Sequence, residues 1–419
     1  LIMAVMFWLA LRWEQDMNKP RGNRWLILIA FVIGLSFGVH FMGLLTIPAI
    51  GLIYYFKNYK TITVTNFIVA NVVSAAILLF IFKLLLPNAL KIFSASEIFF
   101  VNSLGMPFNS GTIIAFIIVV AAFYFGLKYT RKHQKHVANT LVLCLLFIFI
   151  GFSCWLMLPI RANAKVVINE NDPSNARELL AYYNLEQYPE THLFYGPLFT
   201  EQYTGLDKNE PYVDDKPNYE KDKAAGKYII VNDYKNAKQN YNAEHASILP
   251  RMWSAENAEN YMMFTGLLDF NIKPEYQMEN QIRDMVADFK QNVREGNVDY
   301  SDYNKFLKQF GQYLTIEKPS LVQNIGYMLE YQFGYMYWRY FMWNFVGRQN
   351  DIQGKYDDLN GNWISGIKPF DAWHLNMSQD NLPSDVENNK ARNTYYFLPL
   401  ILGIIGFLFL VGRDKKLFW

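Results

Sequence analysis

The chain has 419 residues, a formal charge of +2 at pH 7 and 52% hydrophobic residues. This nearly balanced charge excludes a nucleic-acid partner that is recognised through a strongly basic surface. The two cysteines, Cys144 and Cys154, lie in one apolar stretch, which excludes a disulfide framework and predicts small buried side chains.

The apolar residues are unevenly distributed. Residues 1–158 hold long apolar runs, residues 159–394 are rich in polar side chains, and residues 395–412 are apolar again. About 20 apolar helical residues cross the ~30 Å hydrocarbon layer of a membrane. We therefore predict a polytopic α-helical membrane protein with one large extracytoplasmic domain, mainly α with some β, at residues 159–394. The predicted membrane segments are 1–13, 25–38, 41–56, 67–86, 112–129, 137–158 and 395–412, and residues 413–419 begin a further cytoplasmic segment.

Four basic clusters indicate the orientation, because loops rich in Lys and Arg stay on the cytoplasmic side. They are residues 12–24, 57–60, 128–135 and 413–416. All four face the cytoplasm only if residues 25–56 cross the membrane out and back, and small residues around His40 allow such a break. Because Leu1 already lies within an apolar run, we interpret the sequence as a fragment of a longer protein.

Local patterns predict a few elements of the polar domain. Asp172 and Pro173 are typical of a helix start and precede a helix over residues 175–188. Residues 201–227 are charged and contain prolines, which favours a long exposed loop, and residues 228–231 predict a short strand. Apolar spacing predicts amphipathic helices over 275–295 and 301–314.

Residues 320–346 are crowded with aromatic side chains and predict a helix. Such rings suit a membrane interface or stacking on sugars, and they equally suit an ordinary aromatic core. A polar run bounded by Gly347 and Gly354 follows this helix, and it suggests an anion or glycan site because Arg offers forked donors. The alternative is a helix end at Gly347 whose last carbonyls are satisfied by Arg348. The candidate substrate-binding residues are Trp338, Arg339, Trp343, Arg348, Asn350 and Asp351.

Three ionisable residues are candidates for acid–base chemistry. His40 lies at the tip of the predicted hairpin, Glu97 lies in a predicted outer loop over residues 87–111, and Glu170 follows the span that ends at residue 158. A packed neutral His40 is the alternative for the first, and Asp172 beside Glu170 is expected to cap a helix. The His and Cys spacings predict no metal site, and no cofactor-binding motif is present.

Several segments together resemble a known family. They are residues 24–50, 169–188, 193–200, 250–254, 338–354 and 362–366. They are similar to the large bacterial membrane proteins of the domain of unknown function 2723 family, which are related to transmembrane protein O-mannosyltransferases and to glycosyltransferase family 117.

The resemblance implies a glycosyltransferase C-like helix bundle in the bacterial inner membrane, with the large domain on the periplasmic side. It implies a polyprenyl-phosphate sugar as donor, a protein Ser or Thr as acceptor, and an aspartate base on an outer loop that precedes Leu1. The alternative is a non-catalytic envelope protein whose outer domain binds a glycan, a lipid or a secreted partner. The partners expected on either interpretation include the lipid bilayer and exclude nucleic acid.

Overall fold

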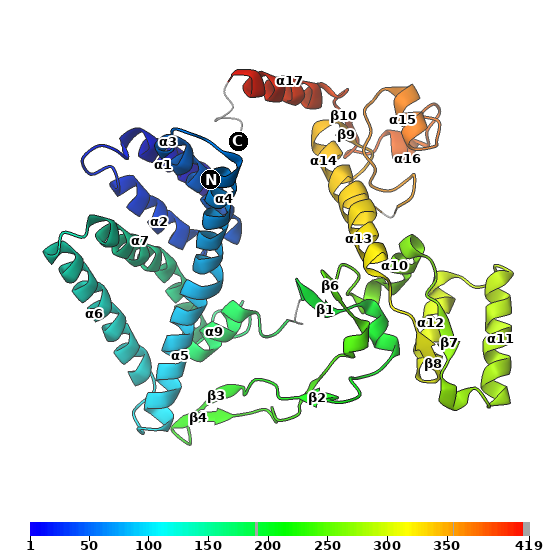
Figure 1. Cartoon of the computed structure of the whole chain (residues 1–419), viewed down its shortest axis with the longest axis horizontal. Helices are drawn as coiled ribbons and strands as arrows, with labels where there is room; N and C mark the ends of the chain where they lie inside the picture. The colour runs from blue at the N-terminus through cyan, green and yellow to red at the C-terminus, as the bar shows by residue number, and fades with distance from the viewer. Residues whose placement is uncertain (189–191, 355, 414–419) are drawn as a thin grey trace. The chain divides into compact units, whose positions relative to one another are not determined.

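A computed structural model describes residues 1–188, 192–354 and 356–413, and these divide into two compact units. We call residues 1–188 with 217–232 the helical unit, and residues 192–216 with 233–413 the second unit. Figure 1 labels the elements of both. The helical unit contains α1 (Ile2–Asp16), α2 (Arg24–Ser36), η1 (Phe41–Leu45), α3 (Thr46–Asn58), α4 (Val64–Leu79), η2 (Phe80–Leu85), α5 (Leu86–Asn102), α6 (Ser110–Lys132), α7 (His136–Phe152), η3 (Ser153–Leu156), α8 (Met157–Asn163), α9 (Ala176–Asn184), β3 (Tyr219–Asp222) and β4 (Lys227–Ile230).

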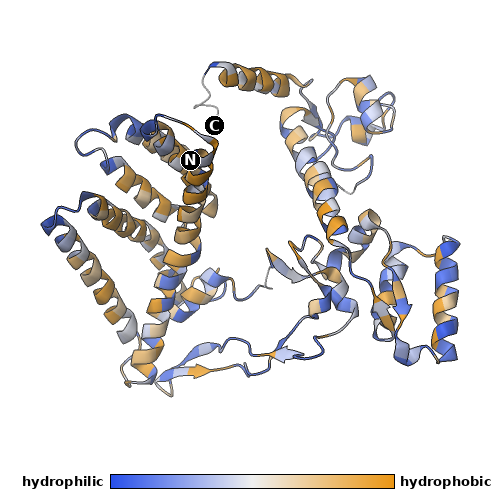
Figure 2. Ribbon diagram, in the orientation of Figure 1, coloured by the Kyte–Doolittle hydropathy of each residue, from blue (hydrophilic) through white to orange (hydrophobic). Residues whose placement is uncertain are grey.

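Within the part of the chain that the structure describes, three helical stretches are long and apolar enough to cross a membrane. They are Val64–Asn102, Ser110–Lys132 and His136–Asn163, and α2 and α17 (Leu398–Arg413) are shorter apolar helices. The apolar colouring of these helices is plain in Figure 2. A helix lies in each of the predicted membrane segments, and the number of crossings that these helices make stays a prediction.

The basic segments of the helical unit lie at one end of it. Lys57, at the end of α3, bonds Glu14 at the end of α1, with Nζ and Oε1 2.9 Å apart. Asn23, just before α2, donates to Thr140 in the first turn of α7 at 3.3 Å. The chain therefore leaves the basic end of the unit through α2 and returns to it through α3. This path agrees with the break in the helix that was predicted around His40.

Two glycines let α2 and α7 pack closely. A Cβ atom on Gly34 would lie 2.1 Å from the carbonyl oxygen of Ile148, and one on Gly151 would lie 2.2 Å from that of Phe31. Such contacts are impossible for any larger residue without moving the helices apart. The two helices run in the same direction away from the basic end, so the segments that follow them lie near each other.

The expectation of an outer loop over residues 87–111 is wrong. Residues 64–102 form one continuous helix, in which the π-helical turn η2 joins α4 to α5. A proline inside a helix lacks an N–H and clashes with the carbonyl four residues earlier. The wide π turn immediately before Pro87 relieves that clash and lets the helix continue to Asn102.

The second unit is mixed α and β, and its strands form antiparallel pairs. The pairs are β1–β6, β2–β5, β7–β8 and β9–β10. Its elements are β1 (Tyr195–Pro197), η4 (Phe199–Tyr203), β2 (Tyr212–Val213), β5 (Lys238–Gln239), η5 (Ala243–His245), β6 (Ala246–Ile248), η6 (Ala255–Asn257), α10 (Ala258–Thr265), β7 (Phe270–Ile272), η7 (Pro274–Tyr276), α11 (Asn280–Arg294), α12 (Tyr300–Phe310), η8 (Gly311–Tyr313), β8 (Leu314–Ile316), α13 (Leu321–Tyr327), η9 (Met328–Tyr337), α14 (Trp338–Phe345), β9 (Gly347–Arg348), α15 (Lys368–His374), α16 (Ser384–Glu387), β10 (Asn393–Thr394) and α17.

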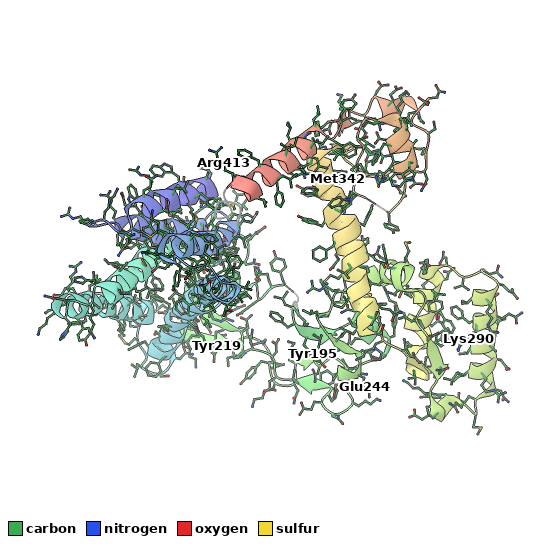
Figure 3. The ribbon with its side chains drawn as sticks, turned by 45° about the horizontal axis from the view of Figure 1, so that its top comes forward. Tyr195, Tyr219, Glu244, Lys290, Met342 and Arg413 are labelled. Atoms are coloured by element: carbon green, nitrogen blue, oxygen red, sulfur yellow. The ribbon has the colours of Figure 1, made fainter. Side chains whose placement is uncertain are left out.

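The amphipathic helices predicted in this unit are confirmed as α11 and α12. Their apolar faces meet in the core, where the rings of Phe289 and Phe306 stack with centroids 3.6 Å apart. The aromatic segment is confirmed as one helix over α13, η9 and α14. Its last turn packs against the start of α17 through Met342 and Leu400, and Figure 3 labels Met342 at this junction.

Two local predictions differ from the structure. The cap of α9 is Asn175, whose Oδ1 accepts from the backbone of Arg177 and Glu178, and not Asp172, which instead accepts from Asn169. Residues 201–227 contain η4, β2 and β3 rather than a loop alone, while the strand predicted at 228–231 is confirmed as β4. The β3–β4 hairpin is held by contacts with α5 that local sequence patterns do not show.

Candidate functional site

An open cavity of about 750 Å³ lies in the helical unit, at the ends of α2 and α7 away from the basic loops. Its walls come from the segment after α2, from η2, from the segment after α7 and from α9. The residues that line it include Phe37, His40, Phe82, Lys83, Trp155, Glu170 and Tyr183. Because it is formed at helix ends, the cavity is reached from the side opposite the basic clusters.

Aromatic rings form a continuous wall of this cavity. The centroids of Phe41 and Phe82 lie 5.6 Å apart, and those of Phe37 and Phe41 lie 5.4 Å apart. Trp155 packs on Tyr183 at 5.4 Å and donates its indole N–H to the carbonyl of Phe37 at 2.9 Å. The wall is therefore stabilised by both ring packing and a hydrogen bond.

The π turn supplies one further bond to this wall. In η2 the amide of Leu86 donates to the carbonyl of Ile81, five residues back. In that register the carbonyl of Phe82 would accept from residue 87, which is a proline and has no N–H. The hydroxyl of Tyr183 donates to this carbonyl instead, at 2.9 Å. Tyr183 thereby holds α9 against the helix that carries Lys83.

His40, Glu170 and Lys83 are among the side chains that line the cavity, and the first two were candidates from the sequence. The Nδ1 atom of His40 accepts from the backbone N–H of Met42 at 3.1 Å, so the neutral ring carries its proton on Nε2. Glu170 is exposed on the segment that leads to α9. Lys83 is exposed beside the ring of Phe82, with Nζ 5.0 Å from the centroid. The cavity thus offers a cation, an imidazole and a carboxylate.

Glu97 does not lie in this cavity. It is fully buried on α5, where its carboxylate accepts from the backbone N–H groups of Asn109 (2.6 Å) and Thr112 (2.9 Å). The hydroxyls of Thr112 and Tyr228 complete its surroundings, at 3.0 and 3.3 Å. A carboxylate among the free amides of a helix start is an N-terminal cap, so the geometry gives Glu97 a role in holding α6 onto α5.

The β3–β4 hairpin covers Glu97. The side-chain amide of Asn102 both donates to and accepts from the backbone of Tyr228, at 2.8 and 2.9 Å. The ring of Tyr228 packs on Phe108 at 5.4 Å, and Nζ of Lys221 lies 4.3 Å from the Phe108 centroid. The hairpin lies beside the end of α5 in Figure 1, and these contacts exclude water from the carboxylate.

The six candidate substrate-binding residues lie in the second unit, and three of them form one cluster. The guanidinium of Arg339 lies between the rings of Tyr335 (5.3 Å) and Trp343 (5.2 Å), and that of Arg348 lies 5.7 Å from Trp343. Arg339 also donates to the carbonyl of Gly361 at 2.7 Å. Trp343 donates to the carbonyl of Asn362 at 3.0 Å. These donors hold the loop over residues 357–362.

Asn350 belongs to the same internal network. Its Oδ1 accepts from the backbone N–H of Gly361 at 2.8 Å, and its Nδ2 donates to the carbonyl of Leu359 at 3.0 Å. Asp351 is exposed in the following turn, and Trp338 stacks on Phe341 away from the cluster. The structure therefore gives Arg339, Trp343 and Asn350 bonds within the fold, and their role in substrate binding stays a prediction.

Sequence reasoning missed Lys83 and Tyr183. Lys83 is the charged side chain inside the apolar run over residues 67–86, and a charge at such depth is a signal of function. No local signal marks Tyr183, because its importance depends on the orphaned carbonyl of Phe82. Among the described residues, no three His, Cys, Asp or Glu side chains lie close enough to hold a metal ion.

Comparison with known proteins gives two partial matches. Residues 1–63 match the family model of the Protein O-mannosyl-transferase TMEM260 N-terminal domain. Residues 189–329 match a model described as a Family of unknown function (DUF8416). No curated protein and no solved structure matches the chain.

Neither match covers half of the chain, and residues 338–354 lie outside both. The first match includes α1, α2, α3 and the His40 segment of the cavity wall. Over these residues the chain is similar to that O-mannosyltransferase domain, and its long apolar helices indicate membrane association.

Proposed function

We propose that this chain is part of a membrane-embedded glycosyltransferase that transfers a sugar from a polyprenyl-phosphate donor to a protein Ser or Thr hydroxyl. The reaction takes place on the outer face of the bacterial inner membrane, where the cavity of the helical unit holds the phosphate and the first sugar. The match of residues 1–63 to an O-mannosyltransferase domain supports the reaction class. The observation that carries the proposal is the cavity that joins Lys83, His40 and Glu170 to an aromatic wall.

Each part of the cavity suits a part of such a donor. The Lys83 ammonium attracts the phosphodiester and stabilises the charge that grows on the phosphate as its bond to the sugar breaks. Aromatic rings such as Trp155 offer apolar faces to the sugar ring. The proton on Nε2 of His40 is available to a phosphate or sugar oxygen, and the Glu170 carboxylate accepts from sugar hydroxyls.

The chemistry requires a base for the acceptor. In the proposed step the acceptor oxygen bonds to the anomeric carbon, the carbon–oxygen bond to phosphate breaks, and the phosphate keeps the electron pair. The acceptor proton passes to a carboxylate, for which we propose an aspartate on an outer loop. Lys83 acts on the leaving group and not on this proton transfer.

The test compares two lysines of the helix formed by α4, η2 and α5. Lys83→Gln removes the cation of the cavity, whereas Lys91→Gln removes an exposed cation of α5 that does not line it. With polyprenyl-phosphate mannose and a Ser/Thr peptide in proteoliposomes, we expect Lys83→Gln to lower kcat/KM at least about tenfold, equal to ~1.4 kcal/mol. Lys91→Gln should stay within about twofold. Equal activities of the two variants would refute the proposed site.

The non-catalytic alternative is favoured by one observation in the second unit. Leu329, Phe333, Tyr337 and Tyr340 form an exposed stripe along η9 and α14, with the spacing of one helix face. A protein that only binds glycan or lipid through this stripe would retain the lipid-linked sugar without transferring it. Binding without any glycosylated peptide, measured by mass in the same proteoliposomes, would favour this alternative.

A further inference from the structure

A short helix of the second unit presents apolar side chains to its surroundings. In α15 and the residue before it, Trp373 is 74% exposed, Ile367 is 43% exposed and Phe370 is 36% exposed. Exposed single apolar residues are ordinary, but a cluster that includes an almost uncovered tryptophan is typical of an interaction surface. We call Ile367, Phe370 and Trp373 the α15 patch.

The α15 patch is continuous with the start of α17. The ring of Phe370 packs on Phe397 at 5.1 Å and on Trp373 at 5.7 Å. The backbone N–H of Tyr396 donates to the carbonyl of Ser365 at 3.0 Å, and that of Tyr395 donates to Val346 at 2.8 Å. These bonds and ring contacts connect the residues just before α17 to α15 and to the segment that precedes it.

The helix α17 has the surface of a segment surrounded by lipid. It fully buries none of its residues, and the large apolar side chains from Ile401 to Phe409 are exposed. In water such a helix would be strongly disfavoured, and in a bilayer it is stable because its backbone bonds are satisfied internally. Tyr395 and Tyr396 are exposed at its start, where membrane proteins commonly carry aromatic residues at the level of the headgroups.

The α15 patch is held rigidly in place. Asp371 is buried, and its carboxylate accepts from the backbone N–H groups of Ser365 (2.7 Å) and Gly366 (2.8 Å) and from the Ser365 hydroxyl (2.7 Å). Lys368 is exposed at the start of α15 and bonds Asp380, with Nζ and Oδ1 2.7 Å apart. This pair is locally neutral, so the apolar side chains dominate the surface that α15 presents.

We propose that the α15 patch inserts into the interfacial layer of the same bilayer that α17 enters, as a second membrane contact of this unit. The occupant of the patch is lipid, because the patch continues the apolar surface of α17 through Phe397 and ends in Trp373, a residue type that is enriched at the membrane interface. The second unit is therefore attached to the membrane both by α17 and by the α15 patch. This proposal does not depend on the proposed enzymatic activity.

Spin labelling of the full chain in phospholipid vesicles tests the insertion. Cys144 and Cys154 are free thiols, so the background carries Cys144→Ala and Cys154→Ala. A nitroxide is attached at Trp373→Cys, and the matched control is Trp253→Cys, since Trp253 is also exposed (51%) but lies in a turn beside the α10 core. We expect the label at 373 to be relaxed more by oxygen, which concentrates in lipid, than by a water-soluble nickel chelate. The label at 253 should show the reverse order.

Both other outcomes would overturn the proposal. If the nickel chelate relaxed the label at 373 as strongly as the label at 253, the patch would lie in water. A label shielded from both reagents would mean that protein, and not lipid, covers the patch. An unlabelled check is Trp373→Phe, which should reduce the quenching of tryptophan fluorescence by brominated lipids, whereas Trp253→Phe should leave that quenching unchanged.

Discussion

The variant Glu97→Gln separates a structural role of Glu97 from a catalytic one. In the wild-type protein its two oxygens accept from the backbone N–H groups of Asn109 and Thr112, at 2.6 and 2.9 Å. A glutamine of the same shape has one oxygen and one NH2 group, so one of these N–H groups would face another donor. The variant therefore loses a hydrogen bond to a buried helix start without creating a cavity.

The size of the effect follows from two contributions. A bond to a charged group is worth about 1.5–3 kcal/mol, and the loss of a negative charge at the start of α6 costs about 0.3–1 kcal/mol. Together these predict a loss of about 2–4 kcal/mol in the free energy that holds the α5–α6 turn closed. Local opening of this turn should become roughly 30- to 1000-fold more frequent, since ~1.4 kcal/mol is a factor of ten.

Amide hydrogen exchange of the full chain in detergent micelles measures that opening. We expect faster exchange in peptides covering residues 109–115 of Glu97→Gln, and unchanged exchange there in the control Glu170→Gln, because Glu170 is exposed and caps no helix. If Glu97→Gln left this exchange unchanged but abolished sugar transfer, the cap interpretation would be refuted and an acid–base role would be favoured.

Three further predictions concern stability. Asn324→Ala should lower the free energy of unfolding by about 3 kcal/mol, as measured by urea unfolding. The side-chain amide of Asn324 is buried; its oxygen accepts from the backbone N–H groups of residues 251 and 252, and its nitrogen donates to the carbonyl of residue 249. Burial lowers the pKa of His245 from 6.5 to about 4, so as the pH falls the unfolded chain binds a proton at a higher pH than the folded chain does. The free energy of unfolding should therefore fall by up to roughly 3 kcal/mol between pH 6.5 and pH 4, and this pH dependence should be absent in His245→Asn. Gly34→Val should separate α2 from α7 and cost about 1–3 kcal/mol, seen as a lower Tm in detergent, whereas Gly403→Val on α17 should not, since no atom lies within 4 Å of its Cβ position.

The helices were predictable because their signals are local. Apolar runs predict α6 and α7, and the spacing of Phe306 and Phe310 predicts α12. The break around His40 was predictable from the small residues beside it and from the requirement that the basic clusters share one side. For α6, α7 and α12 the residues that carry the information lie within the element itself.

The surroundings of Glu97 were not predictable in this way. The predicted loop over residues 87–111 begins at Pro87, whereas the helix continues past this proline to Asn102. The burial of Glu97 depends on Tyr228, which comes from a hairpin 131 residues further along the chain. The same hairpin belongs to a charged stretch that favours a loop when read alone. The paired bonds between Asn102 and Tyr228 join these two segments of the chain.

The cavity shows how one residue can connect local and distant structure. Pro87 is visible in the sequence as a proline within an apolar run, and it explains the π turn before it. The π turn leaves the carbonyl of Phe82 without a donor in its own register, and a carbonyl that the helix does not pair needs another partner. Tyr183, 101 residues away, supplies that partner and brings α9 onto the helix beside Lys83. A substitution at Pro87 would therefore act on the cavity through the position of α9, although Pro87 itself carries no group that could bind a donor.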